Sequence, residues 1–236
     1  MTPTTDTTIR ADPEAIADAM RLILAPGQIT ELRALNAKLA GDYRPGTVSG
    51  YFDDIDKLAA AAASIRCASG VYFVPNIVNP ALLARAHNRI RQVQKESTTS
   101  DADIIARRWM LIDVDPMRPA GISSTDSEHQ AALAVAQQIA DHLRGEGWTD
   151  PLMGDSGNGG HLLYRIDLPT ADGSIVQRCL AALASQFNTP TVKVDTDVFN
   201  PARIWKLYGT VACKGDSTPE RPHRLARILS KLHDPQ

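Results

Sequence analysis

Residues 111–116 (LIDVDP) constrain this chain more than any other part of its sequence. The segment has the apolar character of a buried strand but carries Asp113 and Asp115 two positions apart. Residues i and i+2 of a strand point to the same face, so the two carboxylates would stand side by side while Ile112 and Val114 face a core. Adjacent like charges oppose folding unless a cation holds them. Either the strand ends at Pro116 with both carboxylates solvated, or the pair binds a divalent metal such as Mg²⁺.

A glycine-rich segment, DSGNGGH (155–161), precedes another apolar run. Its glycines allow backbone amides to approach an anion, while Ser156 and His161 offer side-chain donors for a phosphate. A tight hairpin turn is the alternative interpretation. The segment is not a P-loop, because no GK[ST] follows.

A second pair of carboxylates, Asp195 and Asp197, lies in an apolar segment, and Arg203, Lys206 and Lys214 follow it. Two such pairs with a Gly-Ser-His turn and nearby cations are hard to explain structurally. Carboxylates that bind divalent ions bridging a triphosphate, with cations on the phosphates, are typical of two-metal phosphoryl transfer.

Composition excludes several other classes of protein. The 236 residues are 43% hydrophobic and 22% charged, which is typical of a soluble globular chain. The three cysteines have no CxxC spacing, which argues against a disulfide framework and against a zinc site made by this chain alone. No signal peptide or long apolar run occurs, so we expect a cytoplasmic protein that does not associate with membranes.

Charge is unevenly distributed along the chain. The net charge is −2, yet residues 203–231 carry seven Lys or Arg against Asp216 and Glu220, and the remainder is correspondingly acidic. This basic segment is either an anion-binding patch or a solvated surface.

Residues 1–11 are Thr-rich and predict a disordered tail, after which Asp12-Pro13 predicts the start of a helix. The polar stretch at 94–103 is the best internal boundary. Further predictions for the N-terminal half are a strand within 28–39, a turn-rich stretch at 41–50, a helix over 53–65, a short strand at 71–76 and a helix from Pro80 through Ile90.

In the C-terminal half, a capping box at 125–128 predicts the start of a long helix. The other predicted elements there are strands at 108–115, 161–169, 192–199 and 206–213, and a helix over 175–187. Alternating strands and helices indicate a sheet covered by helices on one face.

LIDVDP, SGNGGH and VKVDTDVFNPARIWKLYGT, in this order, resemble the archaeo-eukaryotic primase superfamily. The likeness is greatest to primase-polymerase domains of plasmids, phages and other mobile or CRISPR-linked systems. It covers about residues 29–229. The second motif is longer here than the SxH of the family, so whether Ser156 or Asn158 meets the phosphates stays open.

The resemblance implies an α+β fold in which an N-terminal α/β subdomain (12–103) faces an RRM-like catalytic subdomain (104–236) across a cleft. It implies that Asp113, Asp115 and Asp195 are catalytic and bind two Mg²⁺ or Mn²⁺ ions. The implied nucleotide-binding residues are Ser156, Asn158, Gly159, His161, Arg203 and Lys206. Lys214, Arg221, Arg224 and Arg227 are candidate DNA-binding residues, and we expect Trp205 in the core, with stacking on a base as the alternative.

The implied function is a DNA-dependent primase-polymerase that uses NTPs or dNTPs on a single-stranded DNA template. A helicase or another replication or repair protein is a further partner that the resemblance allows. The alternatives are another metal-dependent nucleotidyl-transfer enzyme or nuclease, and a DNA-binding replication module without catalysis.

Overall fold

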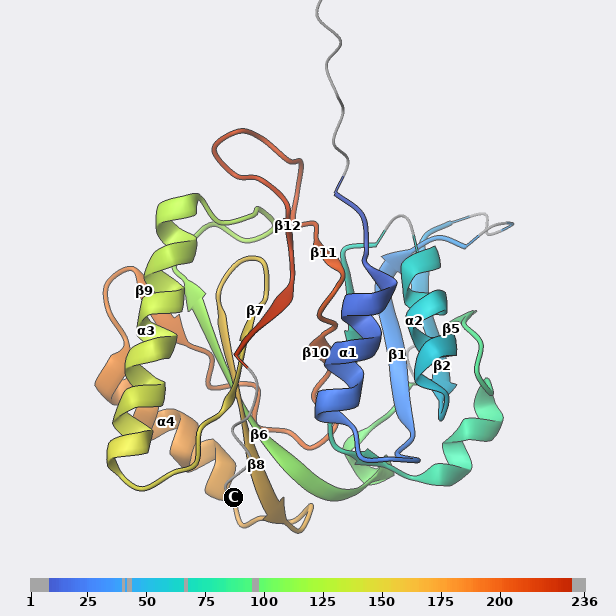
Figure 1. The fold of residues 1–236 in the computed structure, drawn as a ribbon, viewed down its shortest axis with the longest axis horizontal. Coiled ribbons are helices and arrows are strands. Elements are labelled where there is room, and N and C mark those ends of the chain that lie inside the picture. The colour runs from blue at the N-terminus through green and yellow to red at the C-terminus, as the bar shows by residue number, and fades with distance from the viewer. Residues whose placement is uncertain (1–8, 40, 42–43, 66–67, 95–97, 231–236) are drawn as a thin grey trace, which may run out of the picture.

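The computed structural model describes residues 9–39, 41, 44–65, 68–94 and 98–230. Most of the predicted tail, Cys67, part of the predicted loop at 94–103 and Lys231 therefore lie outside the described residues. Helices and antiparallel sheets are mixed along the chain, which confirms the predicted α+β fold (Figure 1). Among the described residues, no helix has the length and apolar character needed to span a membrane.

The N-terminal half builds a five-stranded antiparallel sheet in the order β10-β3-β1-β2-β5. Helices α1 and α2 pack beside it (Figure 1). The elements of this half are α1 (Pro13–Ile23), β1 (Thr30–Ala37), β2 (Gly46–Phe52), α2 (Ile55–Ser64), β3 (Gly70–Phe73), β4 (Ile77–Val78), the 3₁₀ helix η1 (Pro80–Arg85) and β5 (Arg91–Val93).

The C-terminal half builds the second sheet, in the order β13-β7-β8-β6-β4, with β9 also paired to β6. The elements of this half of the chain are the 3₁₀ helix η3 (Asp101–Asp103), β6 (Ile104–Pro116), α3 (Asp126–Gly145), β7 (Leu152–Asp155), β8 (Gly160–Leu168), α4 (Ile175–Phe187), β9 (Val192–Val194), β10 (Trp205–Lys206), β11 (Val211–Ala212), β12 (Arg224–Leu225) and β13 (Arg227–Ser230).

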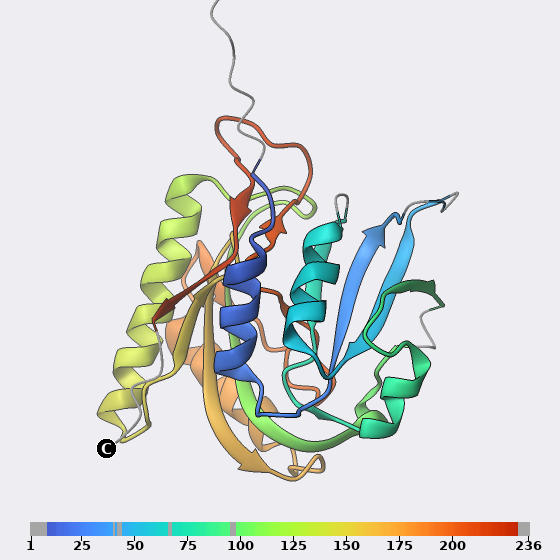
Figure 2. The same cartoon turned by 45° about the vertical axis from the view of Figure 1, so that its right-hand side comes forward.

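The order β6-α3-β7-β8-α4-β9 with spatial order β9-β6-β8-β7 is the arrangement of an RRM-like sheet. Helices α3 and α4 cover its outer face (Figure 1). Helix α1 lies between the two sheets (Figure 2), and the indole Nε1 of Trp109 on β6 donates to the Ile23 carbonyl at the end of α1. One hydrophobic core joins both halves.

Each sheet also takes one strand from the other half of the chain. Strand β4 pairs with the start of β6, while β10 pairs with β3 in the N-terminal sheet. The chain therefore passes back and forth between the two sheets, and residues of both line the space between them.

Several predicted elements are wrong in detail. Strand β2 begins inside the predicted turn-rich stretch at 41–50, because Val48 pairs with Ala34 of β1 and is buried. The helix predicted from Pro80 through Ile90 is only the 3₁₀ helix η1. The strand predicted at 192–199 ends at Val194, and the one predicted at 206–213 is broken by a turn after β10.

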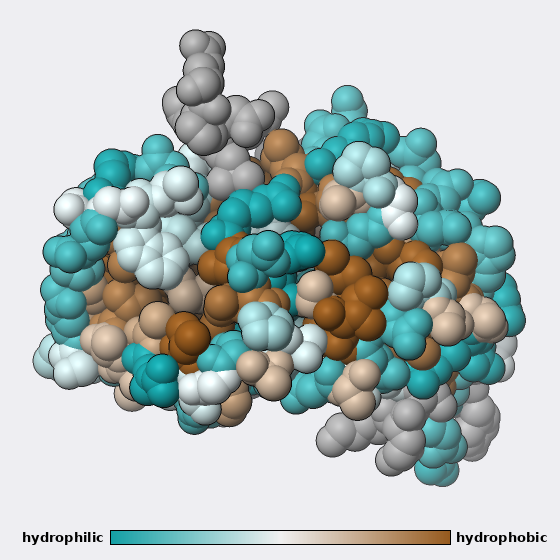
Figure 3. All heavy atoms as spheres, turned by 90° about the horizontal axis from the view of Figure 1, so that it is seen from below, coloured by the Kyte–Doolittle hydropathy of each residue, from teal (hydrophilic) through white to brown (hydrophobic). Residues whose placement is uncertain are grey.

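The surface seen from below in Figure 1 carries several separate apolar patches with polar side chains between them (Figure 3). Large apolar side chains that are exposed among the described residues include Ile105, Met117, Ile175 and Leu229. They come from different elements, so no single element presents a continuous apolar face.

We expect Asp12→Ala to lower the free energy of unfolding by about 1 kcal/mol, the usual effect of losing an N-cap. Its carboxylate accepts hydrogen bonds from the Glu14 and Ala15 amides at the start of α1. Urea denaturation measures the change, and Asp12→Asn is the matched control because Asn also caps helices. Equal loss in both variants would contradict a capping role.

Candidate active site

Strand β6 places the two predicted carboxylates at the centre of the second sheet. Its register with β8 sets Asp113 opposite His161, and its register with β9 sets Asp115 opposite Lys193. Ile112 and Val114 point the other way and are fully buried. The strand does end at Pro116, but the carboxylates line a pocket, with only 21% of the Asp113 and 25% of the Asp115 side chain exposed.

The two carboxylates have unequal electrostatic surroundings. Burial raises the pKa of Asp113, but the nearby His161, together with the charges of Lys214 and Arg118, outweighs burial and holds that pKa below its usual value. Burial and the neighbouring Asp113 charge raise the pKa of Asp115 above its usual value. The surroundings therefore stabilise the charged form of Asp113, whereas the repulsion between the two carboxylates disfavours the charged form of Asp115.

His161 is held by a short chain of buried polar groups. The Trp205 indole Nε1 donates to the Tyr208 oxygen (3.0 Å), and the same oxygen lies 3.0 Å from His161 Nδ1. A Tyr208 hydroxyl that accepts from the indole can donate its own proton to Nδ1, an arrangement that leaves Nε2 as the protonated ring nitrogen. That nitrogen lies 3.5 Å from Asp113 Oδ1. The structure therefore presents an N–H donor beside the carboxylates.

Trp205 is 2% exposed and its ring packs 4.0 Å from the imidazole, measured between ring centroids. This buried position agrees with the expected core residue. The indole therefore packs against the imidazole ring of His161.

The glycine-rich segment is a hairpin turn between β7 and β8 that also lines the pocket. The Ser156 hydroxyl accepts from the amides of Asn158 and Gly159, so it closes the turn. The Asn158 side-chain oxygen accepts from the Ser124 amide. A Cβ on Gly159 would lie 2.2 Å from the Val114 carbonyl, so only glycine lets the turn pack against β6. Both polar side chains thus have structural partners, and the question of which one meets a phosphate stays open.

Asp195 follows β9 directly, and its amide donates to the Asp113 carbonyl at 2.8 Å. Its carboxylate accepts from the Asp197 amide, which makes a turn and ends the strand. Asp195 lines the pocket, while Asp197 is exposed and does not. The two acids therefore do not share a strand face, contrary to the pattern expected from their spacing.

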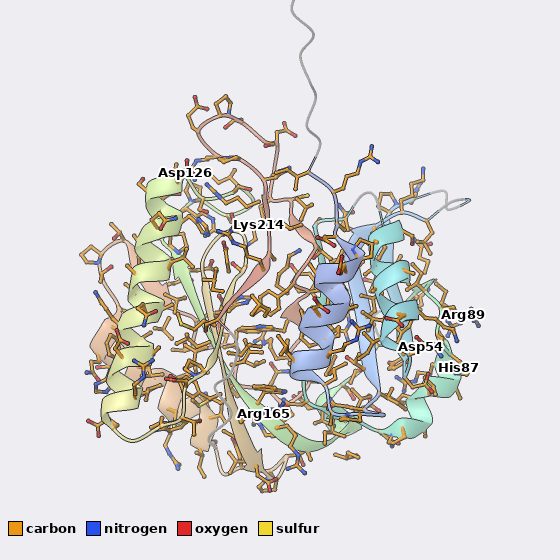
Figure 4. All side chains as sticks on the ribbon, in the orientation of Figure 1. Asp54, His87, Arg89, Asp126, Arg165 and Lys214 are labelled. Carbon is orange, nitrogen blue, oxygen red and sulfur yellow. The ribbon has the colours of Figure 1, made fainter. Side chains whose placement is uncertain are left out.

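Three predicted cations, Arg203, Lys206 and Lys214, line the same pocket. Arg203 Nε is buried without a hydrogen-bond partner among the described residues. Lys206 donates to the Val211 carbonyl, and burial lowers its pKa to about 7. Lys214 lies between the two halves of the molecule (Figure 4).

The more distant arginines lie outside the pocket. Arg221 forms a bidentate pair with Glu128 and donates to the Ser123 carbonyl. Arg224 pairs with Asp126, which is labelled at the end of α3 in Figure 4, and Arg227 Nε lies 3.6 Å from Asp155. Arg221 and Arg224 brace the start of α3, a role that the sequence did not indicate.

Segments far apart in the sequence thus meet in one pocket of about 260 Å³. Its lining includes Asp113, Asp115, Asn158, Ser156, His161, Asp195, Arg203, Lys206 and Lys214, together with Tyr72, Ser69 and Trp205. Sequence reasoning missed Tyr72 and Tyr208, because a tyrosine in an apolar strand or turn carries no signal that separates it from the core.

The carboxylates of the pocket are its candidate metal ligands. Within the described part of the chain, no three His, Cys, Asp or Glu side chains stand close enough together to hold a metal ion as they are placed. Asp113 Oδ1 is nevertheless buried, and among the described residues it accepts no hydrogen bond, since His161 Nε2 stays 3.5 Å away. A buried carboxylate oxygen without a partner is costly, and carboxylate oxygens are the ligands preferred by Mg²⁺ and Mn²⁺. The residues therefore fit a hard divalent cation.

No protein-family model and no curated protein matches this sequence. Among solved structures, the chain is similar to the AEP domain of the primase-polymerase of cyanophage S-2L, with a TM-score of 0.51, 14% identity, and coverage of 96% of this chain and 95% of that one. The chain has the fold of a primase-polymerase domain. The resemblance seen in the sequence is thus confirmed at the level of the fold.

A weaker likeness is to the primase RepB′, with a TM-score of 0.42, 11% identity, and coverage of 93% of this chain and 56% of that one.

We expect Lys206→Met to raise the free energy of unfolding near pH 7.5 by on the order of 1–4 kcal/mol. The unfolded chain holds this proton up to pH 10.5, whereas the folded protein releases it at about 7. Wild-type stability should therefore rise between pH 7 and 10.5, and the variant should lack that rise. Urea denaturation at several pH values tests this, with the exposed Lys38→Met as control. Parallel pH curves for the two variants would contradict it.

Asp115→Asn should raise the melting temperature by about 2–4 °C, the effect of roughly 1 kcal/mol in a chain of this size. Asp113→Asn should give no such gain, because the surrounding cations favour its charge. Thermal unfolding in EDTA at pH 7.5 makes the comparison, and a gain in Asp113→Asn alone would reverse the assignment.

Proposed function

We propose that this chain is a DNA-dependent primase-polymerase that transfers nucleotides from NTPs or dNTPs to a growing strand on single-stranded DNA. The observation that carries the proposal is the gathering of Asp113, Asp115, Asp195, His161 and the cations in one pocket of a primase-polymerase fold. The fold alone does not identify the reaction, and the pocket supplies the chemistry that the reaction needs.

In this reaction a 3′-hydroxyl oxygen attacks the α-phosphorus of the incoming nucleotide. A bond from O3′ to the α-phosphorus forms, the bond from that phosphorus to the β-bridging oxygen breaks, pyrophosphate leaves, and the hydroxyl proton passes to solvent. Asp113, Asp115 and Asp195 would hold two Mg²⁺ or Mn²⁺ ions. When bound, such ions activate the hydroxyl and neutralise the leaving pyrophosphate.

The other pocket residues would position the nucleotide. His161 lines the pocket beside Asp113 and would donate from Nε2 to a phosphate oxygen. Arg203 and Lys206 enter from the segment after β9 and would bind the remaining phosphate oxygens. A triphosphate beside Lys206 would also favour its protonated form, because an anion stabilises a buried ammonium.

The test is to incubate the protein with single-stranded DNA, labelled nucleotides and Mn²⁺, and to separate dinucleotides and longer products on a gel. We expect template-dependent products from wild type, and at least a hundredfold loss in Asp113→Asn and Asp195→Asn, since removing a group that stabilises developing charge costs about 10²–10³ in rate.

Asp197→Asn is the matched control, because Asp197 lies two residues from Asp195 but outside the pocket. It should keep most of the activity. Degradation of the template without nucleotides would indicate a nuclease, products without template would indicate another nucleotidyl-transfer enzyme, and DNA binding without products would indicate an inactive replication module.

A further inference from the structure

A second hollow of about 490 Å³ borders the pocket described above. The two share Ser69, Tyr72, Asp115 and Lys214 in their linings, so Asp115 stands at the boundary between them. We call the second hollow the basic groove; it is defined by Asp115, Arg118, Lys193 and Lys214 together with residues 119–121, 213 and 215.

The basic groove has an excess of positive charge. Arg118, Lys193 and Lys214 face a single carboxylate, Asp115. Lys193 pairs with Asp115 across β9 and β6, so their side chains share a sheet face. Lys193 is exposed, and neither it nor Lys214 has an ion-pair partner among the described residues. The groove is therefore suited to an anion.

Its walls are held in place by hydrogen bonds. Arg118 Nε donates to the Ile122 carbonyl, and only 7% of the Arg118 side chain is exposed. The Ser123 hydroxyl donates to the Lys214 carbonyl, and Arg221 donates to the Ser123 carbonyl. The arginine that seemed a candidate DNA contact thus braces the loop that forms the groove, which is the kind of support a preformed binding site requires.

We propose that the basic groove binds the phosphates of the nucleotide that supplies the 3′-hydroxyl, on the side of Asp115 opposite the incoming nucleotide. This inference rests on the proposed function. The transfer joins two nucleotides at the carboxylates, so each needs its own phosphate site. The pocket beyond Asp115 has its own cations in Arg203 and Lys206, which leaves the groove for the second substrate.

The test compares wild type with Lys193→Gln in binding a labelled primer–template and the template strand alone, by fluorescence anisotropy at several salt concentrations. Losing one phosphate contact should weaken primer–template binding roughly three- to tenfold and flatten the log–log salt dependence by about 0.7–0.9. Binding of the template alone should not change.

Arg89→Gln is the matched control, because Arg89 is an exposed cation at the outer edge of the N-terminal half, far from Lys214 (Figure 4). It should leave both affinities and both slopes as in wild type. An equal loss in this control would mean that Lys193 acts only through overall charge and would overturn the proposal.

Three other results would also overturn it. An unchanged primer–template slope in Lys193→Gln, with initiation from ATP also unchanged, would leave the groove without a phosphate. An equal loss on the template alone would make it a template site. An increased KM for the incoming nucleotide, with primer affinity unchanged, would make it a triphosphate site. The affinities and salt slopes for primer–template and template are binding results, so they remain separable from a failure of the protein to polymerise.

The phosphates can come from a primer backbone or from the triphosphate of a first nucleotide. Unprimed synthesis begun with ATP or with adenosine separates the two sources. If the triphosphate uses the groove, Lys193→Gln should reduce initiation with ATP several-fold and leave initiation with adenosine unchanged. If only a primer backbone uses it, the variant should affect primer extension alone.

Discussion

The register of β6 with its two neighbours is the constraint on which the rest of the site depends. It sets Asp113 beside His161 on β8 and Asp115 beside Lys193 on β9. A shift of one residue would turn both carboxylates toward α3 and bring Ile112 and Val114 to the pocket, so the buried apolar face of β6 and the polar site specify each other. The unequal surroundings of the two carboxylates follow from the same register.

Polar residues around the site divide into those that face the pocket and those that shape it. Ser156, Asn158, Arg221 and Arg224 satisfy backbone groups in turns and at the start of α3. Burying those groups without partners would be costly, so such residues are needed for the fold whether or not they touch a substrate. The Trp205–Tyr208–His161 chain belongs to the same category, since it orients one imidazole.

The elements predicted correctly are those that interactions between residues close in the sequence determine. The Asp12 cap, the capping box at Thr125 and Glu128, and the apolar run of β6 all appear where expected. Strands β2 and β7 were not predicted, because each contains glycine, follows a proline, and is held by pairing with other strands. The acids of the pocket were found through their spacing and the family resemblance. Lys193 and Tyr72 were not, since only the pairing of strands brings them to the site.

The exchange of β4 and β10 between the two sheets has a mechanical consequence. Lys206 lies on a strand hydrogen-bonded to β3, while Asp113 lies on a strand hydrogen-bonded to β4, so each sheet holds together strands from both halves of the sequence. Separating the two halves of the sequence, before and after residue 103, would break both pairings. The two sheets should therefore unfold as one cooperative unit.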